Sequence, residues 1–357
     1  MVTNPKVSIC MAAYNAEAYV GRAIESLLAQ TVRDFELIIV EDGSRDATPG
    51  IIRRYACADP RIRALYNQEN RGLVFTRNRA LQECRAPLVA VADADDICLP
   101  ARLEKQWQYL EQHPEVGIIG SAVERLDTDG HRIGTSSFCT EDRHIRLLLR
   151  LGPCLWNTTT VYRRHLLVEA GGYRQGFDRG AEDYDLWARL LKVTQFANLG
   201  ESLVSVHVHG GSVTQRPQGA FANIVRVARG LLSEYLERPV STEQAEDLVL
   251  LFYHGLGRHA QDREIMKLAL SLEGKAQQVE APDTMVLLRE KISKAVWLRA
   301  QARVYSDRRL SLALAFRAAA LKPGMVASAE FAKYACRWSL PNQLRLWLKS
   351  LNKPRQL

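Results

Sequence analysis

Three carboxylates stand close together in VAVADADD, residues 89–96 of this 357-residue chain. Asp93, Asp95 and Asp96 follow a run of small apolar residues that is typical of a buried strand. Like charges at this spacing raise one another's pKa, and a bound cation removes that cost. An Asp-x-Asp pair offers the oxygen ligands that Mg²⁺ or Mn²⁺ prefers, and a diphosphate can complete the shell. The pattern therefore predicts a site for a divalent cation.

Further polar residues follow other apolar strands in the same way. Tyr14 and Asn15 come after the strand that begins at Val7, and Asp42 comes after FELIIVE. In open α/β sheets, ligands bind at the carboxyl edge of the strands. A single acid at such a position is more simply a helix cap or a turn residue, as we expect for Asp46. The convergence of acids from several strands favours a binding site.

The elements that position these residues alternate between strand and helix four times in the first hundred residues. This alternation predicts a parallel sheet built from right-handed βαβ units. The second strand is apolar on both faces, as in sheets that helices cover on both sides. The segments expected to be strands are KVSICM, FELIIVE, IRALYN, PLVAVAD, GIIGSAVERL and ANLGESLVSVHVH.

The composition of the chain changes near residue 219, where strand patterns end and alanine, leucine and arginine dominate. Residues 1–218 carry 26 Lys and Arg against 27 Asp and Glu, whereas residues 219–357 carry 22 against 13. We therefore expect an α/β domain over 1–218 and a helical, basic domain over 219–357. Because the positive charge belongs to the second part alone, we expect no nucleic-acid partner.

The motifs taken together resemble the nucleotide-sugar-dependent glycosyltransferases of family 2. The matching segments, in family order over roughly residues 5–215, are VSICMAAYNAEAYVGRAIESLLAQTVRDFELIIVEDGSRDAT, NRGLVFTRNRAL, VAVADADD, GGYRQGFDRGAEDYDLWARL and SVHVHGGSVT. The resemblance implies a GT-A fold, a Rossmann-like, mixed and mostly parallel sheet flanked by helices, here followed by an all-α region. It also implies inversion of the anomeric centre by a single displacement. The chain has no QxxRW segment, which processive synthases carry, so we expect transfer of one sugar at a time.

The resemblance implies a set of residues that hold the donor. Ala12 and Tyr14 would line the nucleobase pocket, and Asp42 would accept a hydrogen bond from the base. Arg77, in the segment TRN, would lie near the base or the diphosphate. Asp93 would contact the ribose.

The resemblance also implies the metal ligands and the base. Asp95 would hold Mn²⁺ or Mg²⁺, His209 would approach the metal or the diphosphate, and Ser212 would lie nearby at the donor. The cation would neutralise charge on the leaving diphosphate. Asp183 would take the proton of the acceptor hydroxyl as attack proceeds, and inversion needs only one such base.

The acceptor side carries two candidates, Glu182 and Trp156. Glu182 would orient the neighbouring base or touch the acceptor, although the helix dipole also favours acids at a helix start. Trp156 either stacks on an acceptor sugar or packs in the core, and both readings stay open. We expect Trp187 in the core.

The sequence thus predicts an enzyme that moves a sugar from a UDP-sugar or another nucleoside diphosphate sugar to a glycan or lipid-linked acceptor in cell-surface polysaccharide synthesis. Two alternatives stay open. One is a nucleotidyltransferase, although MAAYNAEAYV lacks the Gly-rich basic loop that such enzymes usually carry after the first strand. The other is a non-catalytic module that binds nucleotide sugars and whose helical domain binds partners.

Location is predicted from the ends of the chain and from its cysteines. The sequence has no apolar stretch long enough to span a membrane and no signal peptide, and its seven cysteines are scattered. We expect a cytoplasmic protein with reduced thiols. The tail from Lys333 to Arg355 is basic with interleaved Trp and Leu, which predicts either contact with the inner face of the membrane or a helix packed on the second domain.

Overall fold

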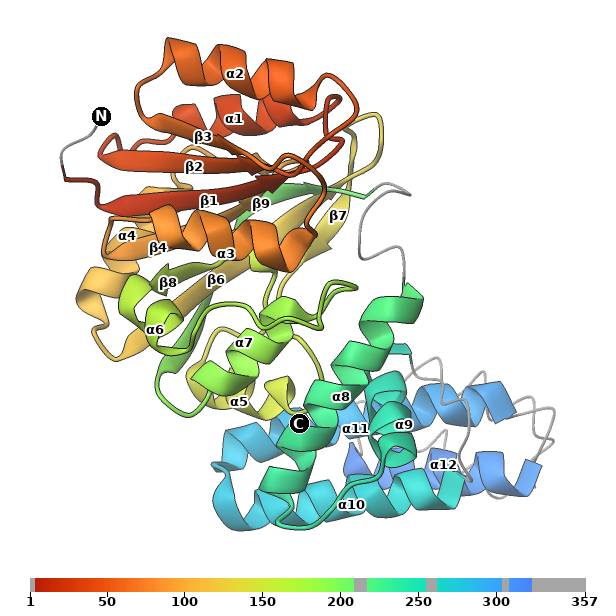
Figure 1. Cartoon of the computed structure of the whole chain (residues 1–357). Helices are drawn as coiled ribbons and strands as arrows, with labels where there is room; N and C mark the ends of the chain where they lie inside the picture. The colour runs from red at the N-terminus through yellow and green to blue at the C-terminus, as the bar shows by residue number, and fades with distance from the viewer. Residues whose placement is uncertain (1–3, 209–216, 255–261, 304–307, 323–357) are drawn as a thin grey trace, which may run out of the picture. The chain divides into compact units, whose positions relative to one another are not determined.

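The computed structural model describes residues 4–208, 217–254, 262–303 and 308–322 (Figure 1). Contacts divide the chain into two units, Met1–Val227 and Ala228–Leu357. The first unit contains a nine-stranded sheet with its helices, and the described part of the second unit is helical. Among the described residues, no helix has both the length and the apolar character needed to cross a membrane.

All strands of the described residues belong to the first unit. They are β1 (Val7–Ala13), β2 (Phe35–Glu41), β3 (Ile62–Tyr66), β4 (Leu88–Asp93), β5 (Ile97–Cys98), β6 (Val116–Leu126), β7 (Arg132–Ser136), β8 (Val161–Arg163) and β9 (Gln195–His207). The helices of the first unit are α1 (Val20–Leu28), α2 (Thr48–Ala58), α3 (Leu73–Glu83), α4 (Arg102–Gln112), α5 (Asp142–Leu149), the short 3₁₀ helix η1 (Asn157–Thr159), α6 (Arg164–Glu169) and α7 (Glu182–Leu190). Helix α8 (Pro217–Tyr235) begins in the first unit and ends in the second, which continues with α9 (Thr242–His254), α10 (Asp262–Val279), α11 (Pro282–Arg303) and α12 (Arg308–Leu321).

The sheet has the order β3-β2-β1-β4-β8-β6-β9-β5, and β7 pairs with β6. Strands β1 to β4 are parallel to one another, and β6 is parallel to β9. Strand β8 is antiparallel to both β4 and β6, and β5 is antiparallel to β9. The prediction of a mixed sheet with a parallel first part is confirmed.

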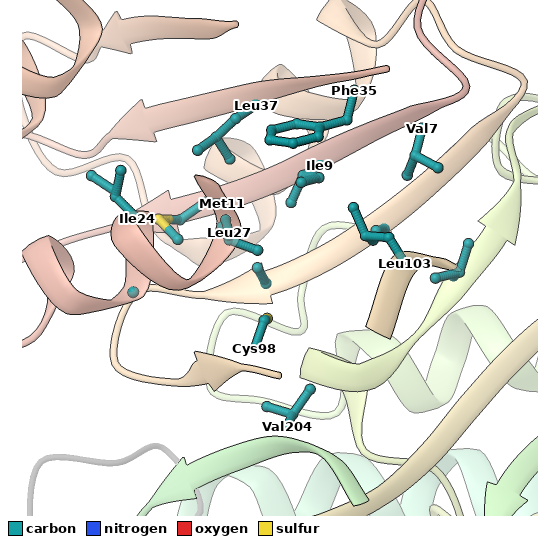
Figure 2. Close-up of a cluster of buried hydrophobic side chains, with 14 of the residues drawn as sticks. Val7, Ile9, Met11, Ile24, Leu27, Phe35, Leu37, Cys98, Leu103 and Val204 are labelled. Carbon is teal, nitrogen blue, oxygen red and sulfur yellow. The ribbon is translucent and has the colours of Figure 1, made fainter. Parts of the chain in front are cut away.

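Helices cover both faces of the parallel strands, as the apolar character of β2 predicted. On one face, Ile9 and Met11 of β1 lie in a buried cluster with Ile24 and Leu27 of α1 (Figure 2). The other face of β1 meets α3, where the buried Cys10 thiol lies 3.1 Å from that of Cys84. Alternate residues of β1 therefore pack in different layers, which is the two-residue period of a strand.

The parallel register aligns the ends of three strands at one edge. Ala12 of β1 pairs with Val40 of β2 on one side and with Asp93 of β4 on the other. The loops that follow these strands therefore start side by side. Strands β5 and β8 were not predicted, because two or three residues are too few to show an alternating pattern.

Candidate active site

Asp42 follows β2 and is almost fully buried, with 3% of its surface exposed. Its Oδ1 accepts from the Asn67 amide at 2.6 Å and from the backbone N–H of Arg71 at 2.9 Å. Its Oδ2 accepts from the N–H of Gly72 at 3.0 Å. Asp42 thus organises the loop that leads into α3. Because a carboxylate oxygen can accept two hydrogen bonds, Oδ2 has room for one more, and its contact with a nucleobase stays a prediction.

A tight turn after β2 sets the position of Asp42. Both carboxylate oxygens of Glu41 accept from the turn, at 2.6 Å from Ser44 N and 3.2 Å from Gly43 N. Gly43 has φ +69, and a Cβ there would stand 2.5 Å from the carbonyl carbon of Glu69. Only glycine fits, because the two loops touch through their backbones.

The first two residues predicted for the nucleobase pocket lie at the end of β1. Ala12 is half-buried within the strand, and Tyr14 beyond it is 44% exposed. Asn15 follows in a left-handed conformation, and its Oδ1 accepts from Arg45 N at 2.9 Å. This contact joins the loop after β1 to the loop after β2, so Ala12, Tyr14 and Asp42 share one edge of the sheet.

The Asp-x-Asp stretch forms the turn between β4 and β5. Asp93 and Asp95 are half-buried, whereas Asp96 is buried. Burial raises the pKa of Asp96 well above its usual value, and the charges of Asp93 and Asp95 raise it further. The repulsion expected from the sequence thus adds to the effect of burial on Asp96.

His207 contacts this turn, which the sequence did not predict. Its Nδ1 lies 2.6 Å from the Asp95 carbonyl oxygen and must carry the proton, since a carbonyl can only accept. Its backbone N–H donates to Asp96 Oδ1 at 3.3 Å. The contact arises because β9 pairs with β5, a pairing that leaves no local signal. His209 and Ser212 lie outside the described residues, so their predicted roles stay predictions.

Arg77 of α3 connects the acids of the site. Its guanidinium is buried and donates to Asp93 Oδ1 at 2.9 Å and to Glu182. The Asn157 amide, with its oxygen toward the guanidinium, accepts from both amino groups at 3.0 Å. Burial lowers the pKa of Arg77, but Glu182 and Asp93 outweigh it and raise the value above that of a free arginine. Arg77 therefore stays charged and joins the predicted ribose contact to the start of α7.

Glu182 and Asp183 begin α7, just after Ala181 in a left-handed conformation with φ +69. Glu182 is 3% exposed and its carboxylate is directed to Arg77. Asp183 is half-buried, and its Oδ1 accepts from Tyr184 N at 2.7 Å. Burial raises the pKa of Asp183, Glu182 raises it further and Arg77 lowers it, which leaves it at about 7. An acid with this pKa can take and release a proton near neutral pH.

The two tryptophans differ in their surroundings. Trp187 is fully buried and its Nε1 donates to the Tyr162 hydroxyl at 2.8 Å, so its prediction as a core residue is confirmed. Trp156 is half-buried, packs against the core cluster and lies 6.0 Å from the Phe138 ring. Its contact with an acceptor stays a prediction, as does that of Glu182.

The chain is similar to known glycosyltransferases. The chain matches the family model described as Glycosyl transferase family 2 over residues 8–171. It is 30% identical over 240 residues to the O-antigen biosynthesis glycosyltransferase WbnJ of Escherichia coli, covering 66% of this chain and 91% of that one. It is 32% identical over 214 residues to the amylovoran biosynthesis glycosyltransferase AmsE of Erwinia amylovora, covering 58% and 79%.

Among solved structures, the chain resembles TarS 1–349 of S. aureus, which was crystallised in complex with UDP-GlcNAc. The TM-score is 0.56 at 18% identity, and the match covers 90% of this chain and 91% of that one. This likeness shows a shared fold.

Proposed function

Because the chain belongs to glycosyl transferase family 2 and is a glycosyltransferase with the GT-A fold, we propose that it moves one sugar at a time from a nucleoside diphosphate sugar to a glycan or lipid-linked acceptor. WbnJ and AmsE are named for O-antigen and amylovoran biosynthesis, which supports a role in cell-surface polysaccharide synthesis. TarS binds UDP-GlcNAc, so UDP-sugars are the first donors to test. Family membership favours this proposal over a nucleotidyltransferase or a non-catalytic module.

The observation that carries the proposal is the chain of ion pairs from Asp93 through Arg77 to Glu182. It joins the edge predicted to bind the donor to the residue beside Asp183. A transferase needs its base next to the donor, because the acceptor must attack the anomeric carbon at close range. This chain of ion pairs supports a donor side with Asp93 at the ribose and an acceptor side with Asp183, joined by Arg77 through Glu182.

Asp183 acts as the general base in the proposed reaction. The acceptor hydroxyl oxygen forms a bond to the anomeric carbon while the bond from that carbon to the diphosphate oxygen breaks. The hydroxyl proton passes to Asp183, whose pKa near 7 suits a base at neutral pH. One displacement inverts the anomeric centre. Ala12, Tyr14 and Asp42 hold the nucleoside in this proposal, with Ser212 nearby.

The residues of the Asp-x-Asp turn fit a divalent cation. Their donors are carboxylate oxygens, which Mn²⁺ and Mg²⁺ prefer. Burial is the main cause of the raised pKa of Asp96, and the charges of Asp93 and Asp95 add to it, a repulsion that a cation would relieve. Asp95, with His209, would hold Mn²⁺ or Mg²⁺, while Asp93 is engaged by Arg77. When bound, such a cation supplies compensation for the charge that develops on the diphosphate.

The tail supports a location at the inner face of the membrane, within the cytoplasm, where lipid-linked acceptors would be reached. Its cationic residues outnumber acids, since no Asp or Glu follows Glu330. Anionic lipids attract such segments when apolar side chains accompany them. The cations are Lys333, Arg337, Arg345, Lys349, Lys353 and Arg355.

The proposal is tested by Asp183→Asn. Hydrolysis and transfer are first measured with Mn²⁺ across UDP-glucose, UDP-galactose, UDP-GlcNAc, UDP-GalNAc and GDP-mannose. We expect Asp183→Asn to keep donor binding by calorimetry and to lose turnover by about 10²- to 10⁴-fold, the range typical of a general base. Asp129→Asn removes a carboxylate from an exposed turn and is the matched control, with unchanged turnover. Full turnover by Asp183→Asn would rule it out as the base.

A further inference from the structure

We propose that Asn223 and Arg226 of α8 are positioning residues that hold the glycine-rich loop 171–181 ahead of Glu182 and Asp183. The inference rests on the proposed function, because it assigns these two side chains to the transfer reaction. Neither residue belongs to the segment that resembles the family, which ends near residue 215.

The two side chains contact the loop directly. Asn223 Nδ2 donates to the carbonyl oxygen of Gly180 at 2.9 Å. Arg226 donates to the carbonyl oxygen of Gly176 at 3.1 Å, and its guanidinium lies 3.9 Å from the centre of the buried Phe177 ring. Residues three apart share one face of a helix, so a single face of α8 provides both contacts.

The loop needs such contacts because its own sequence does little to fix it. Gly172, Gly176 and Gly180 all have positive φ, between +68 and +107. Glycines have the widest choice of backbone conformations, so a loop rich in them is costly to order. A hydrogen bond to the carbonyl of a glycine fixes its peptide plane without needing a side chain.

Helix α3 fixes the other end of the same loop. The Asn78 amide donates to the Tyr173 carbonyl at 2.7 Å and accepts from Tyr173 N at 2.9 Å. Asn78 follows Arg77, the residue that binds Glu182. The loop is therefore anchored by α3 at its start and by α8 at its end, one residue before the Ala181–Glu182 turn.

The loop also lies next to Gly72, in the loop that binds Asp42 at the edge predicted to hold the donor. Asp178 Oδ1 lies 3.4 Å from the point where a Cβ on Gly72 would stand, and Gly72 N donates to Asp42. If this loop shifted, the start of α7 would move with it. The loop would also press on the residues 71 and 72 whose N–H groups bind Asp42. Displacements of about 1 Å can lower turnover by up to 10²-fold in a site that depends on alignment.

The experiment compares Asn223→Ala and Arg226→Ala with Arg229→Ala in the full chain. Arg229 is the matched control, since it is exposed on the same helix and donates instead to Thr242 at 3.0 Å. Turnover and KM are measured with Mn²⁺ and the nucleotide sugar of the panel that the wild type hydrolyses fastest. Amide hydrogen exchange of residues 172–182 is measured in parallel.

We expect each loop variant to lower kcat by about tenfold with little change in donor KM, and to speed exchange in residues 172–182. Arg229→Ala should match the wild type in both measurements. The inference is overturned if the loop variants behave as Arg229→Ala does, or if kcat falls while exchange in the loop is unchanged. A wild type that hydrolyses no nucleotide sugar would instead contradict the proposed function, and unchanged exchange would then still refute the anchoring of the loop.

Discussion

At the scale of single residues, the proposed role of Asp183 as the base predicts how the rate depends on pH. The base must be deprotonated to accept a proton, so we expect kcat/KM to rise with pH and to level off above about 7. Burial is the first cause of the raised pKa, and the charge of Glu182 is the second. Glu182→Gln removes the charge that raises the pKa of Asp183, while the charge of Arg77, which lowers it, remains. The pH at which kcat/KM rises should therefore be lower in this variant. A pH–rate profile of both proteins checks this, and a limb that stays in place contradicts it.

At the residue scale, the sequence identified candidate residues but left their partners open. Asp93, Arg77 and Glu182 were all identified as candidates, yet their ion pairs were not predicted. Arg77 and Glu182 are 105 residues apart, so no local spacing relates them. His207 was missed for the same reason, since its contact with Asp95 depends on the pairing of two strands from distant segments.

At the scale of elements, the turn after β2 and the loop before α3 meet at Gly43. Gly43→Ala should cost about 1–3 kcal/mol in the free energy of unfolding, because positive φ is strained for alanine and the new Cβ would meet the backbone of Glu69 and Asn70. The displaced loop carries the N–H groups that bind Asp42, so nucleotide affinity should fall as well. Denaturant unfolding and calorimetry with UDP measure the two effects.

Gly50→Ala provides the control for this change. Gly50 lies in α2, and a Cβ there would meet nothing within 4 Å. Alanine is the better helix former, so this variant should gain roughly 0.5–1 kcal/mol and keep its affinity for UDP. Equal stability of the two variants would show that the contact at Gly43 is unimportant.

Element prediction worked where the pattern was long enough to have a period. The parallel strands β1 to β4 and the helices between them were predicted because each spans five or more residues of regular apolar spacing. The sequence predicts no element in the segment 130–160, which contains β7, α5 and η1. Strand β7 has five residues, but it is largely exposed and so lacks an apolar alternation. Helix η1 is three residues long and places Asn157 against Arg77.

At the scale of the whole molecule, the uneven charge of the chain predicts a partner. Vesicles of anionic lipid should float the full chain, and Lys349→Gln combined with Lys353→Gln and Arg355→Gln should reduce the floated fraction several-fold, since each cation contributes about 1 kcal/mol of attraction. Neutral vesicles serve as the control. Equal flotation of the variant and the wild type would contradict membrane contact through the tail.

The pairing of Arg77 also has a consequence for how the chain folds as it is synthesised. Asp93 is 16 residues from Arg77, whereas Glu182 is 105 residues away. The parallel strands can assemble as soon as the first hundred residues emerge, with the guanidinium held by its near partner alone. Contacts of long sequence separation form slowly. The contact of His207 with the Asp95 carbonyl spans 112 residues and forms later still. The candidate site is therefore complete only after β9 has emerged, and until then the nascent chain holds the Arg77 guanidinium through Asp93 and, later, Glu182.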